Sequence, residues 1–348
     1  MKNKNDRIEE LDLFRGIAAI LVVLFHYTTK YQEVYGHKMN YIINFPFGKM
    51  AVSTFFILSG FLICKSINKE NSAIQFLWKR FVRMWPCYFV AMIITSIVIC
   101  IGGDAFFDRI PTIKQFICNL TMMPEYLGQK AIDGAYWTQA IEIIFYFIVA
   151  SIILLNKREK IKESSIAWCA ISIILNILIN NFNIIIFKIL GILCIRTYSQ
   201  LFITGILLYY LYNNDKDKKL ICFGLSLCLI NQLLSLGIQY TIFYIVELVL
   251  FYLIIIKSAV KCNKFIGKKF IIFISTISYP LYLLHQMIGY VIINKLENIG
   301  LVNEIFIFVP ITISIILAYL LHKFVEEPII QKTKNVNFLD LFKRQTDK

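Results

Sequence analysis

Charged residues are scarce in this chain, and that scarcity is the first guide to its class. Only 17% of the 348 residues are Asp, Glu, Lys or Arg, whereas 58% are apolar. A soluble domain built around one core has a larger charged share, so the composition indicates a polytopic membrane protein. The sequence also contains no internal repeat, no low-complexity linker and no separate soluble domain.

Histidine is rare and paired cysteine is lacking, which argues against a metal centre. The four histidines have no metal-ligand spacing, and none of the nine cysteines forms a CxxC pair. We interpret the cysteines as small apolar fillers and expect no metal. We also expect no cleavable signal peptide. Residues 1–10 are charged, and no small-residue cleavage site follows the first apolar run. We expect the first apolar run to remain as an anchor.

Acidic residues are outnumbered by basic ones, 22 to 36, which gives a net charge of +14. When the chain is threaded through a bilayer, the dense basic clusters fall on one side, as the positive-inside rule requires. These clusters are residues 65–83, 157–162, 216–219, 257–269 and the tail from Lys323. We therefore expect both termini to be cytoplasmic. Binding to nucleic acid is not needed to explain the charge.

Apolar runs of about 20 residues, long enough to cross a bilayer, recur along the chain. We predict an all-α polytopic membrane protein with about ten transmembrane helices in one bundle. The predicted spans are 13–30, 48–67, 84–102, 137–155, 164–181, 197–212, 219–236, 240–257, 271–293 and 305–322. The segment 183–196 is expected to be re-entrant or interfacial. The predicted parts are a cytoplasmic N-terminus (1–12), a membrane domain (13–322) and a cytoplasmic basic tail (323–348).

Two ionisable side chains lie within the first span, Arg15 and His26. Their separation of eleven residues corresponds to about three helical turns, so both lie on one helix face about 16 Å apart. Ionisable residues inside a membrane span indicate function by default. The small side chains between them suit an anionic group held at Arg15 that presents a reactive group at His26. Alternatively, His26 is a packing histidine bonded to a neighbouring helix.

Glu142 and His285 lie at nearly the same predicted depth as His26. His26 and Glu142 are about 20 Å from the inner ends of their spans, and His285 is about 21 Å, at about 1.5 Å per residue. A shared level is what a buried polar site produces. Glu142 could instead neutralise a buried cation, and the stripe of His285 with Tyr282 and Ser278 could simply join helices.

Arg80 and Arg83 are three residues apart on the cytoplasmic side and therefore share a helix face. Their planar guanidinium groups suit phosphate. The pair indicates either a site for the phosphates of a nucleotide or an anchor to anionic lipid headgroups. Trp137 belongs with the aromatic residues expected at the membrane interface.

At these residues the chain resembles the acyltransferase-3 family of integral membrane acyltransferases. The opening Leu11-Asp-Leu-Phe-Arg15-Gly16 and the Arg-x10-His spacing match the first family block. The other matching blocks are Phe55–Leu62, Arg80-x-x-Arg83 with Pro86, Trp137 with Glu142, Ile277–His285 and Glu327-Pro328. Thr-Gln-Ala stands before Ile141 and Glu142 where serines and leucine are usual. The resemblance covers nearly the whole chain.

The resemblance implies ten core spans in the membrane of a bacterial cell. It also implies that acyl-coenzyme A is the donor substrate, that no cofactor is tightly bound, and that acyl groups, usually acetyl, pass to hydroxyls. The implied acceptors are cell-surface sugars, lipid-linked sugars or related molecules. Functional roles for Arg15, His26, Arg80 and Arg83 are implied as well.

The residues and the resemblance together predict the parts of a site. His26 is expected to be the general base that takes a proton from the acceptor hydroxyl, and Glu142 to orient its ring. The other predicted site residues are Arg15, Arg80 and Arg83 for the donor phosphates, and Trp137, Tyr282 and His285 for the substrate.

Two other function classes stay open from sequence. A transporter or flippase of a polar molecule would use His26 and Glu142 as a proton relay. A catalytically silent partner in polysaccharide export is a further alternative. The basic phosphate site and the missing inverted repeat favour the transferase over the transporter. The acceptor, the acyl chain and the oligomeric state are left open.

Overall fold

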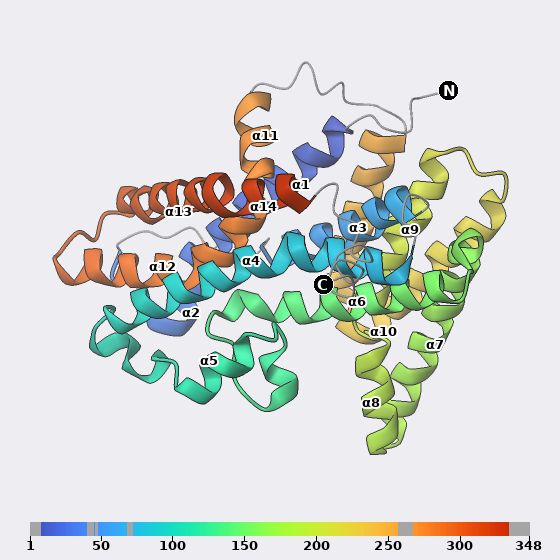
Figure 1. Ribbon diagram of the computed structural model, residues 1–348, viewed down its shortest axis with the longest axis horizontal. Coiled ribbons are helices and arrows are strands. Elements are labelled where there is room, and N and C mark those ends of the chain that lie inside the picture. The colour runs from blue at the N-terminus through green and yellow to red at the C-terminus, as the bar shows by residue number, and fades with distance from the viewer. Residues whose placement is uncertain (1–7, 40–44, 46–47, 68–71, 257–266, 334–348) are drawn as a thin grey trace, which may run out of the picture. The chain divides into compact units, whose positions relative to one another are not determined.

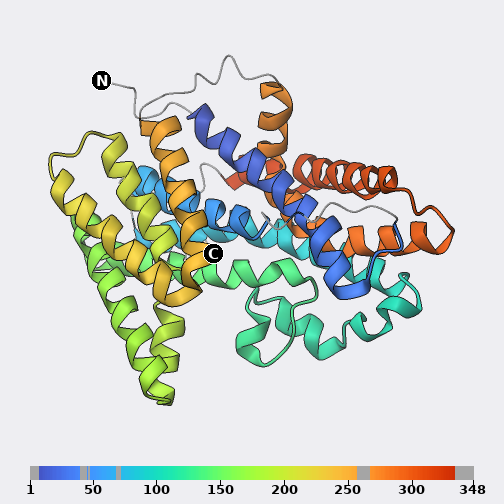
Figure 2. The same ribbon diagram turned by 180° about the vertical axis from the view of Figure 1, so that it is seen from behind.

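The computed structural model describes residues 8–39, 45, 48–67, 72–256 and 267–333, and over these residues it is entirely helical, without a strand (Figures 1 and 2). The predicted all-α class is therefore confirmed. Six helices are long and apolar enough to cross a membrane, or seven if a bent pair forms one span. Two shorter apolar helices, Met50–Ser66 and Ser199–Tyr212, accompany them. This count does not confirm ten crossings or cytoplasmic termini, which stay predictions.

Two of the predicted spans, 219–236 and 240–257, lie on one long helix. Helix α10 (Lys218–Phe251) continues into a π-helical turn (Tyr252–Ile256). Inside α10, Gly237 has a φ of 82° and a ψ of 177°, which interrupts the helical backbone. Glycine adopts such an angle at no steric cost because it has no Cβ. Each of the ten predicted ranges overlaps a described helix, so the difference concerns how the helices join.

A second predicted span, 271–293, is bent rather than straight. Helices α11 (Lys268–Thr276) and α12 (Ser278–Asn298) meet at an angle of 78°. Pro280 lies in the first turn of α12, where its missing N–H removes no helical hydrogen bond. The proline therefore allows a new helix to begin at Ser278.

The segment expected to be re-entrant or interfacial contains the short helix α8 (Ile185–Leu193). Nine residues at about 1.5 Å each give about 14 Å, roughly half of the ~30 Å hydrocarbon core of a bilayer. Its apolar side chains, among them Ile185 and Leu193, are exposed. The length excludes a full crossing by α8 alone, and the interfacial position stays a prediction.

The chain divides into two compact units, which we describe separately. Unit 1 comprises Met1–Arg15, Val52–Leu77 and Glu142–Lys269. Its helices are α3 (Gly48–Ser66), most of α6 (Trp137–Leu154), α7 (Ile161–Asn181), α8, α9 (Ser199–Tyr212) and α10. In its core, the ring of Phe202 stacks on Phe145 at 4.1 Å between centroids and lies 4.8 Å from Phe56. Helices α3, α6 and α9 therefore share one aromatic core.

Unit 2 comprises Gly16–Ala51, Trp78–Ile141 and Phe270–Lys348. It holds most of α1 (Glu9–Phe25), the π-helical turn η1 (His26–Lys30), α2 (Tyr31–Tyr35), most of α4 (Ala73–Cys100), α5 (Ile113–Asn119), α11, α12, α13 (Phe308–Leu321) and α14 (Glu327–Thr333). Helices α12 and α13 run side by side in both views (Figures 1 and 2).

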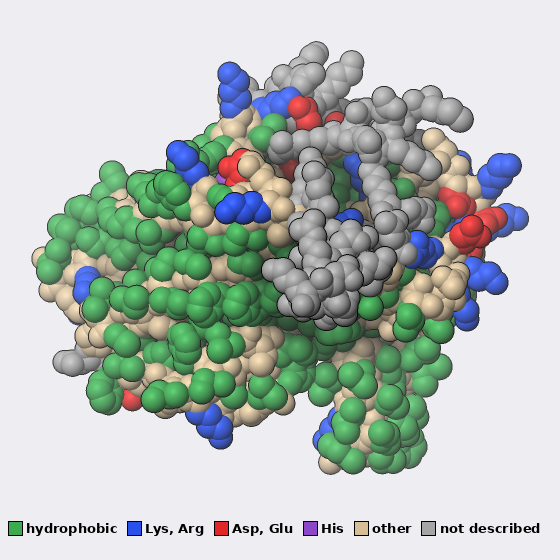
Figure 3. All heavy atoms as spheres, viewed as in Figure 1, with side chains coloured by type: hydrophobic (Ala, Val, Ile, Leu, Met, Phe, Trp, Pro, Cys, Tyr) green, Lys and Arg blue, Asp and Glu red, His purple; other side chains and the backbone are tan. Residues whose placement is uncertain are grey.

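Apolar side chains cover much of the face shown in Figure 3. On α13, Ile313, Ile316 and Leu320 are exposed at helical spacing. A helix that presents large aliphatic side chains outward is stable where the surrounding solvent is lipid. The described helices are therefore those of a multi-pass membrane protein.

The proposed cytoplasmic ends fall partly beyond the described residues. Residues 1–7 and 334–348 lie outside them, and α1 begins at Glu9, within the predicted N-terminal segment. Helix α14 lies within the predicted basic tail. The predicted boundaries at residues 12 and 322 stay predictions.

Candidate active site

The first helix places Arg15 and His26 on one continuous helical run. Helix α1 extends from Glu9 to Phe25 without interruption, and His26 begins the π-helical turn η1. Single π-helical turns are rare and often occur at functional sites. The predicted candidate base therefore lies where the regular helix changes its pitch.

His26 is joined to His285 of α12 by a hydrogen bond within unit 2. His26 Nδ1 lies 2.9 Å from His285 Nε2, and the two rings meet edge to face with centroids 4.8 Å apart. The sequence placed His26 and His285 at nearly the same depth in the membrane, about 20 and 21 Å from the inner ends of their spans. In the structure the two side chains are in contact. The role of His285 as a substrate contact stays a prediction.

The hydrogen-bond partners assign the protons of this pair. His285 Nδ1 faces two backbone carbonyls, those of Leu281 at 3.1 Å and Tyr282 at 2.9 Å, so it carries a proton. In the neutral imidazole, Nε2 then holds the lone pair and accepts from His26 Nδ1. His26 Nδ1 also lies 3.0 Å from the Val22 carbonyl oxygen. That oxygen can only accept a hydrogen bond, so Nδ1 of His26 carries a proton. The lone pair of neutral His26 is therefore on Nε2.

Tyr27, the neighbour of His26, fixes the turn to α12 and α13. Its hydroxyl donates to the backbone oxygen of His285 at 2.7 Å and lies 2.6 Å from the hydroxyl of Ser314. A Cβ on Gly289 would lie 2.1 Å from the ring of Tyr27, so only glycine at 289 permits this approach. Sequence reasoning missed these three residues, because their proximity arises from tertiary packing.

The first residues of α6 also meet α12 near His285. Tyr282 accepts a hydrogen bond from the Thr138 hydroxyl at 3.0 Å, and its ring centroid lies 5.7 Å from that of His285. Trp137, the residue before Thr138, is half-buried at the start of α6. The structure thus brings Tyr282 to His285 and to the neighbour of Trp137. Their substrate contacts remain predicted.

Asp133 ties the segment before α6 to the middle of α12. Its carboxylate is fully buried and accepts from the backbone N–H of Ala135 at 2.8 Å and of Met287 at 2.9 Å. Burial raises the pKa of Asp133 to about 6, while the two N–H donors and Arg109 oppose the shift. Sequence reasoning did not single out this residue.

The stability of the protein is expected to fall as Asp133 ionises. Because its pKa in the folded state is raised above the value of about 3.9 in an unfolded chain, the folded state binds more protons between about pH 4 and 6. The free energy of unfolding should therefore decrease by about 2 to 3 kcal/mol as the pH rises through that window, and then stay level. Melting curves of wild type and Asp133→Asn in detergent measure this. A melting-temperature difference that does not change with pH would contradict it.

Glu142 is the first residue of the α6 segment in unit 1. It accepts hydrogen bonds from the hydroxyls of Ser59, at 3.1 Å, and of Tyr146. Both partners belong to unit 1, and Ser59 lies within the predicted second block. The predicted role of Glu142 in orienting His26 stays a prediction.

The three arginines predicted for the donor lie on α1 and α4. Arg15 lies 4.0 Å from Asp12, one turn earlier. On α4, Arg80 is half-buried and Arg83 exposed, one turn apart. Gly16, beside Arg15, allows a close approach, because a Cβ there would lie 2.3 Å from the carbonyl oxygen of Ile271. Phosphate binding by these arginines stays a prediction.

Several known proteins are similar to this chain. Nodulation protein 10 of Rhizobium leguminosarum bv. viciae is 24% identical over 43% of the chain and 45% of its own length. Acyltransferase MdmB of Streptomyces mycarofaciens is 26% identical over 36% of the chain and 33% of its own length. An O-acetyl transferase of Shigella phage Sf6 is 27% identical over 43% of the chain and 47% of its own length. The chain thus spans less than half the length of these relatives, and no solved structure matches it.

The family match is far more extensive than these pairwise similarities. The sequence profile of the acyltransferase domain family matches residues 8–323, from the start of α1 to the π-helical turn after α13. That stretch includes His26 and His285, the arginines of α1 and α4, and Glu142. The chain therefore belongs to the acyltransferase domain family.

Proposed function

We propose that this protein is a membrane O-acyltransferase of the bacterial cell membrane. It moves an acyl group, by expectation acetyl, from acyl-coenzyme A on the cytoplasmic side to a hydroxyl of a cell-surface saccharide or related acceptor. The observation that carries the proposal is the pairing of His26 with His285, which leaves the lone pair on His26 Nε2. The family match supports it, as do relatives named as an acyltransferase and an O-acetyl transferase.

In the proposed reaction, His26 Nε2 takes the proton of the acceptor hydroxyl as its oxygen attacks the thioester carbonyl. The new C–O bond forms, the C–S bond breaks, and the proton passes from His26 to the departing thiolate. Histidine suits this task because its ordinary pKa, about 6.5, lies close to neutral pH. Arg15, Arg80 and Arg83 hold the donor's phosphates, since guanidinium groups bind phosphate through paired hydrogen bonds. Glu142 supports the charge on the imidazolium in this scheme.

The proposal is tested by following thiol release from acetyl-coenzyme A by the purified protein in detergent. Release that rises when an extract of bacterial surface glycan is added, with acetyl groups appearing on the glycan, supports the transferase. Succinyl- and longer acyl-coenzyme A donors are run in parallel to define the acyl chain. No donor binding and no thiol release with any donor would overturn the proposal and favour a transporter.

His285 is expected to act by holding the ring of His26. In His285→Leu the acceptor for His26 Nδ1 is lost, and kcat should fall by about 10- to 100-fold, the cost of a misplaced catalytic group. In His285→Gln the side-chain oxygen can still accept a hydrogen bond from His26 Nδ1. The kcat of this variant should therefore lie between those of wild type and His285→Leu. The KM for acetyl-coenzyme A should stay near that of wild type in both variants. Equal activity in all three proteins would contradict this role.

A further inference from the structure

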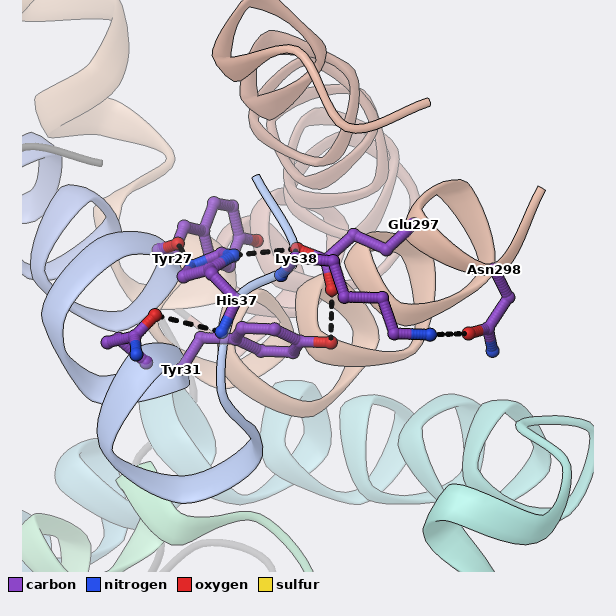
Figure 4. Close-up of polar contacts among 7 residues, drawn as sticks. Tyr27, Tyr31, His37, Lys38, Glu297 and Asn298 are labelled. Atoms are coloured by element: carbon purple, nitrogen blue, oxygen red, sulfur yellow. Dashed lines mark hydrogen bonds and ion pairs between the residues drawn. The ribbon is translucent and has the colours of Figure 1, made fainter. Parts of the chain in front are cut away.

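The loop after α2 folds back onto the C-terminal end of α12 (Figure 4). Helix α2 ends at Tyr35, and Gly36, with a φ of 70°, turns the chain. The next residue, His37, donates its backbone N–H to Gln32 Oε1 at 2.8 Å. On the same loop, the Lys38 ammonium donates to Asn298 Oδ1 at 2.7 Å. The loop is thus tied both to α2 and to α12.

Both ring nitrogens of His37 face oxygen atoms, and both oxygens only accept hydrogen bonds when Glu297 is ionised. Nδ1 lies 2.8 Å from a carboxylate oxygen of Glu297, and Nε2 lies 2.9 Å from the backbone carbonyl of Tyr27. A neutral imidazole has one N–H and would present a lone pair to one of these oxygens. A doubly protonated ring satisfies both contacts. With Glu297 ionised, the geometry therefore places a positive charge on His37.

Glu297 is in a position to stabilise that charge. Its side chain is only 2% exposed and that of His37 only 1%, so both charges are withdrawn from water. The carboxylate also accepts from the Lys38 backbone N–H at 3.2 Å and from the Tyr31 hydroxyl at 3.4 Å. A buried charge without a partner is costly, whereas a pair with its remaining hydrogen bonds satisfied is tolerated. The two ionised groups thus depend on each other.

The ion pair of His37 and Glu297 is connected through Tyr27 to the π-helical turn η1, which carries His26. The carbonyl that accepts from His37 belongs to the residue after His26, within the π-helical turn. The hydroxyl of the same tyrosine donates to the backbone of His285. The ring of His37 also packs on Tyr31, with centroids 4.5 Å apart. The turn is therefore held at Tyr27 twice, by His37 through the backbone carbonyl and by His285 through the hydroxyl.

We propose that Glu297 holds His37 as an imidazolium and that this buried ion pair is a positioning element for His26. His37 and Glu297 are positioning residues, because they act on the turn that carries His26. The proposal rests on the proposed function for the role of His26. The groups facing the His37 ring are Glu297 of α12, the Tyr31 ring of α2 and the Tyr27 carbonyl of η1. The Lys38 ammonium is bonded to Asn298.

The charge on His37 can be measured without any enzymatic assay. The chain has four histidines, so ¹⁵N-histidine labelling of the purified protein gives a small set of ring signals. His37→Gln identifies the signals of His37 by removing them. At pH 7.5 we expect both nitrogens of His37 to be protonated in wild type and one to lose its proton in Glu297→Gln. A neutral His37 in the wild-type protein would overturn the proposal.

The positioning role is tested by the effect of the same variants on turnover. His37→Gln and Glu297→Gln should each lower kcat for acetyl transfer by about 10- to 100-fold, as expected for a displaced catalytic group. The KM for acetyl-coenzyme A should change by less than about twofold, because donor binding is not affected. Lys38→Ala is the matched control, since it removes a contact of the same loop and leaves the buried pair. It should keep kcat within about twofold of wild type.

A double variant keeps the test decisive if a single variant fails to fold. Removing one partner of a buried ion pair is strongly destabilising, whereas neutralising both is often tolerated. His37→Gln with Glu297→Gln should therefore fold with a melting temperature above those of the single variants, yet retain the low kcat. Wild-type kcat in this folded double variant would overturn the positioning role. If wild type itself releases no thiol, the proposed function fails, while the ¹⁵N measurement still decides the charge of His37.

Discussion

Replacing His26 with alanine is expected to lower acetyl transfer by about 100- to 10,000-fold, the range that a general base contributes. The variant removes the Nε2 lone pair and leaves the rest of the helix unchanged, because alanine favours helical structure. Thiol release from acetyl-coenzyme A, with and without surface-glycan extract, measures the loss. Membrane insertion and elution of the purified protein should match wild type.

A second histidine provides the control for this variant. His322 lies in the π-helical turn η10 (His322–Glu326), where its Nδ1 is 2.8 Å from a carboxylate oxygen of Glu326. It is also partly buried in unit 2, yet it contacts neither His26 nor His285 through this bond. His322→Ala should therefore retain turnover within about twofold of wild type. Appreciable transfer by His26→Ala would remove His26 from the role of base.

Replacing Gly205 of α9 with alanine is expected to prevent unit 1 from packing normally. A Cβ at this position would lie 1.9 Å from the carbonyl oxygen of Ile57, and one at Gly60 of α3 would lie 2.0 Å from that of Phe202. The two helices thus meet backbone to backbone, as membrane helices with small residues at their contact do. Because backbone cannot move aside as a side chain can, we expect a loss of about 3 kcal/mol or more. The melting temperature and the yield of monodisperse protein measure it.

Gly224 of α10 is the matched control for this prediction. It also lies in unit 1, but the atoms nearest to a Cβ there belong to the side chains of Leu207, at 2.8 Å, and Ile166, at 2.9 Å. Side chains can move where backbone cannot, so Gly224→Ala should cost about 1 to 2 kcal/mol, less than Gly205→Ala. If Gly205→Ala melts at the same temperature as Gly224→Ala, the close helix contact is not as described.

The sequence was informative about element type and less so about how elements join. Apolar runs of the right length predict helices because a membrane permits little else, and all ten predicted ranges overlap helices. The break at Gly237 and the bend between α11 and α12 depend on single backbone angles, which hydropathy does not report.

The candidate site shows the same division. Counting residues from the inner ends of the spans placed His26 and His285 at one level, and they are hydrogen-bonded. Burial of His37 could not be predicted, because this residue follows a short polar stretch outside the predicted spans. Its partner Glu297 lies 260 residues away. Pairs of this kind are created by tertiary packing, and a single sequence does not reveal them.

The contacts that η1 and α2 make with α12 also fix the relative direction of these segments. His26 meets His285, whereas Tyr31, further along the chain, meets Tyr290 by its ring and Glu297 by its hydroxyl. The segment from His26 to Tyr31 and helix α12 therefore run in the same direction. A chain can return to run in the same direction only after an odd number of intervening crossings.

This parity gives the interruption in α10 a topological meaning. If α3, α4, α6, α7 and α9 each cross once, a single passage of α10 would make the intervening number even and would reverse α12. Two passages make it odd, with the chain turning at Gly237, where φ is 82°. One residue without a side chain would then decide on which side of the membrane every later residue emerges. The accessibility of Lys295 to a membrane-impermeant amine reagent in intact cells would report that side.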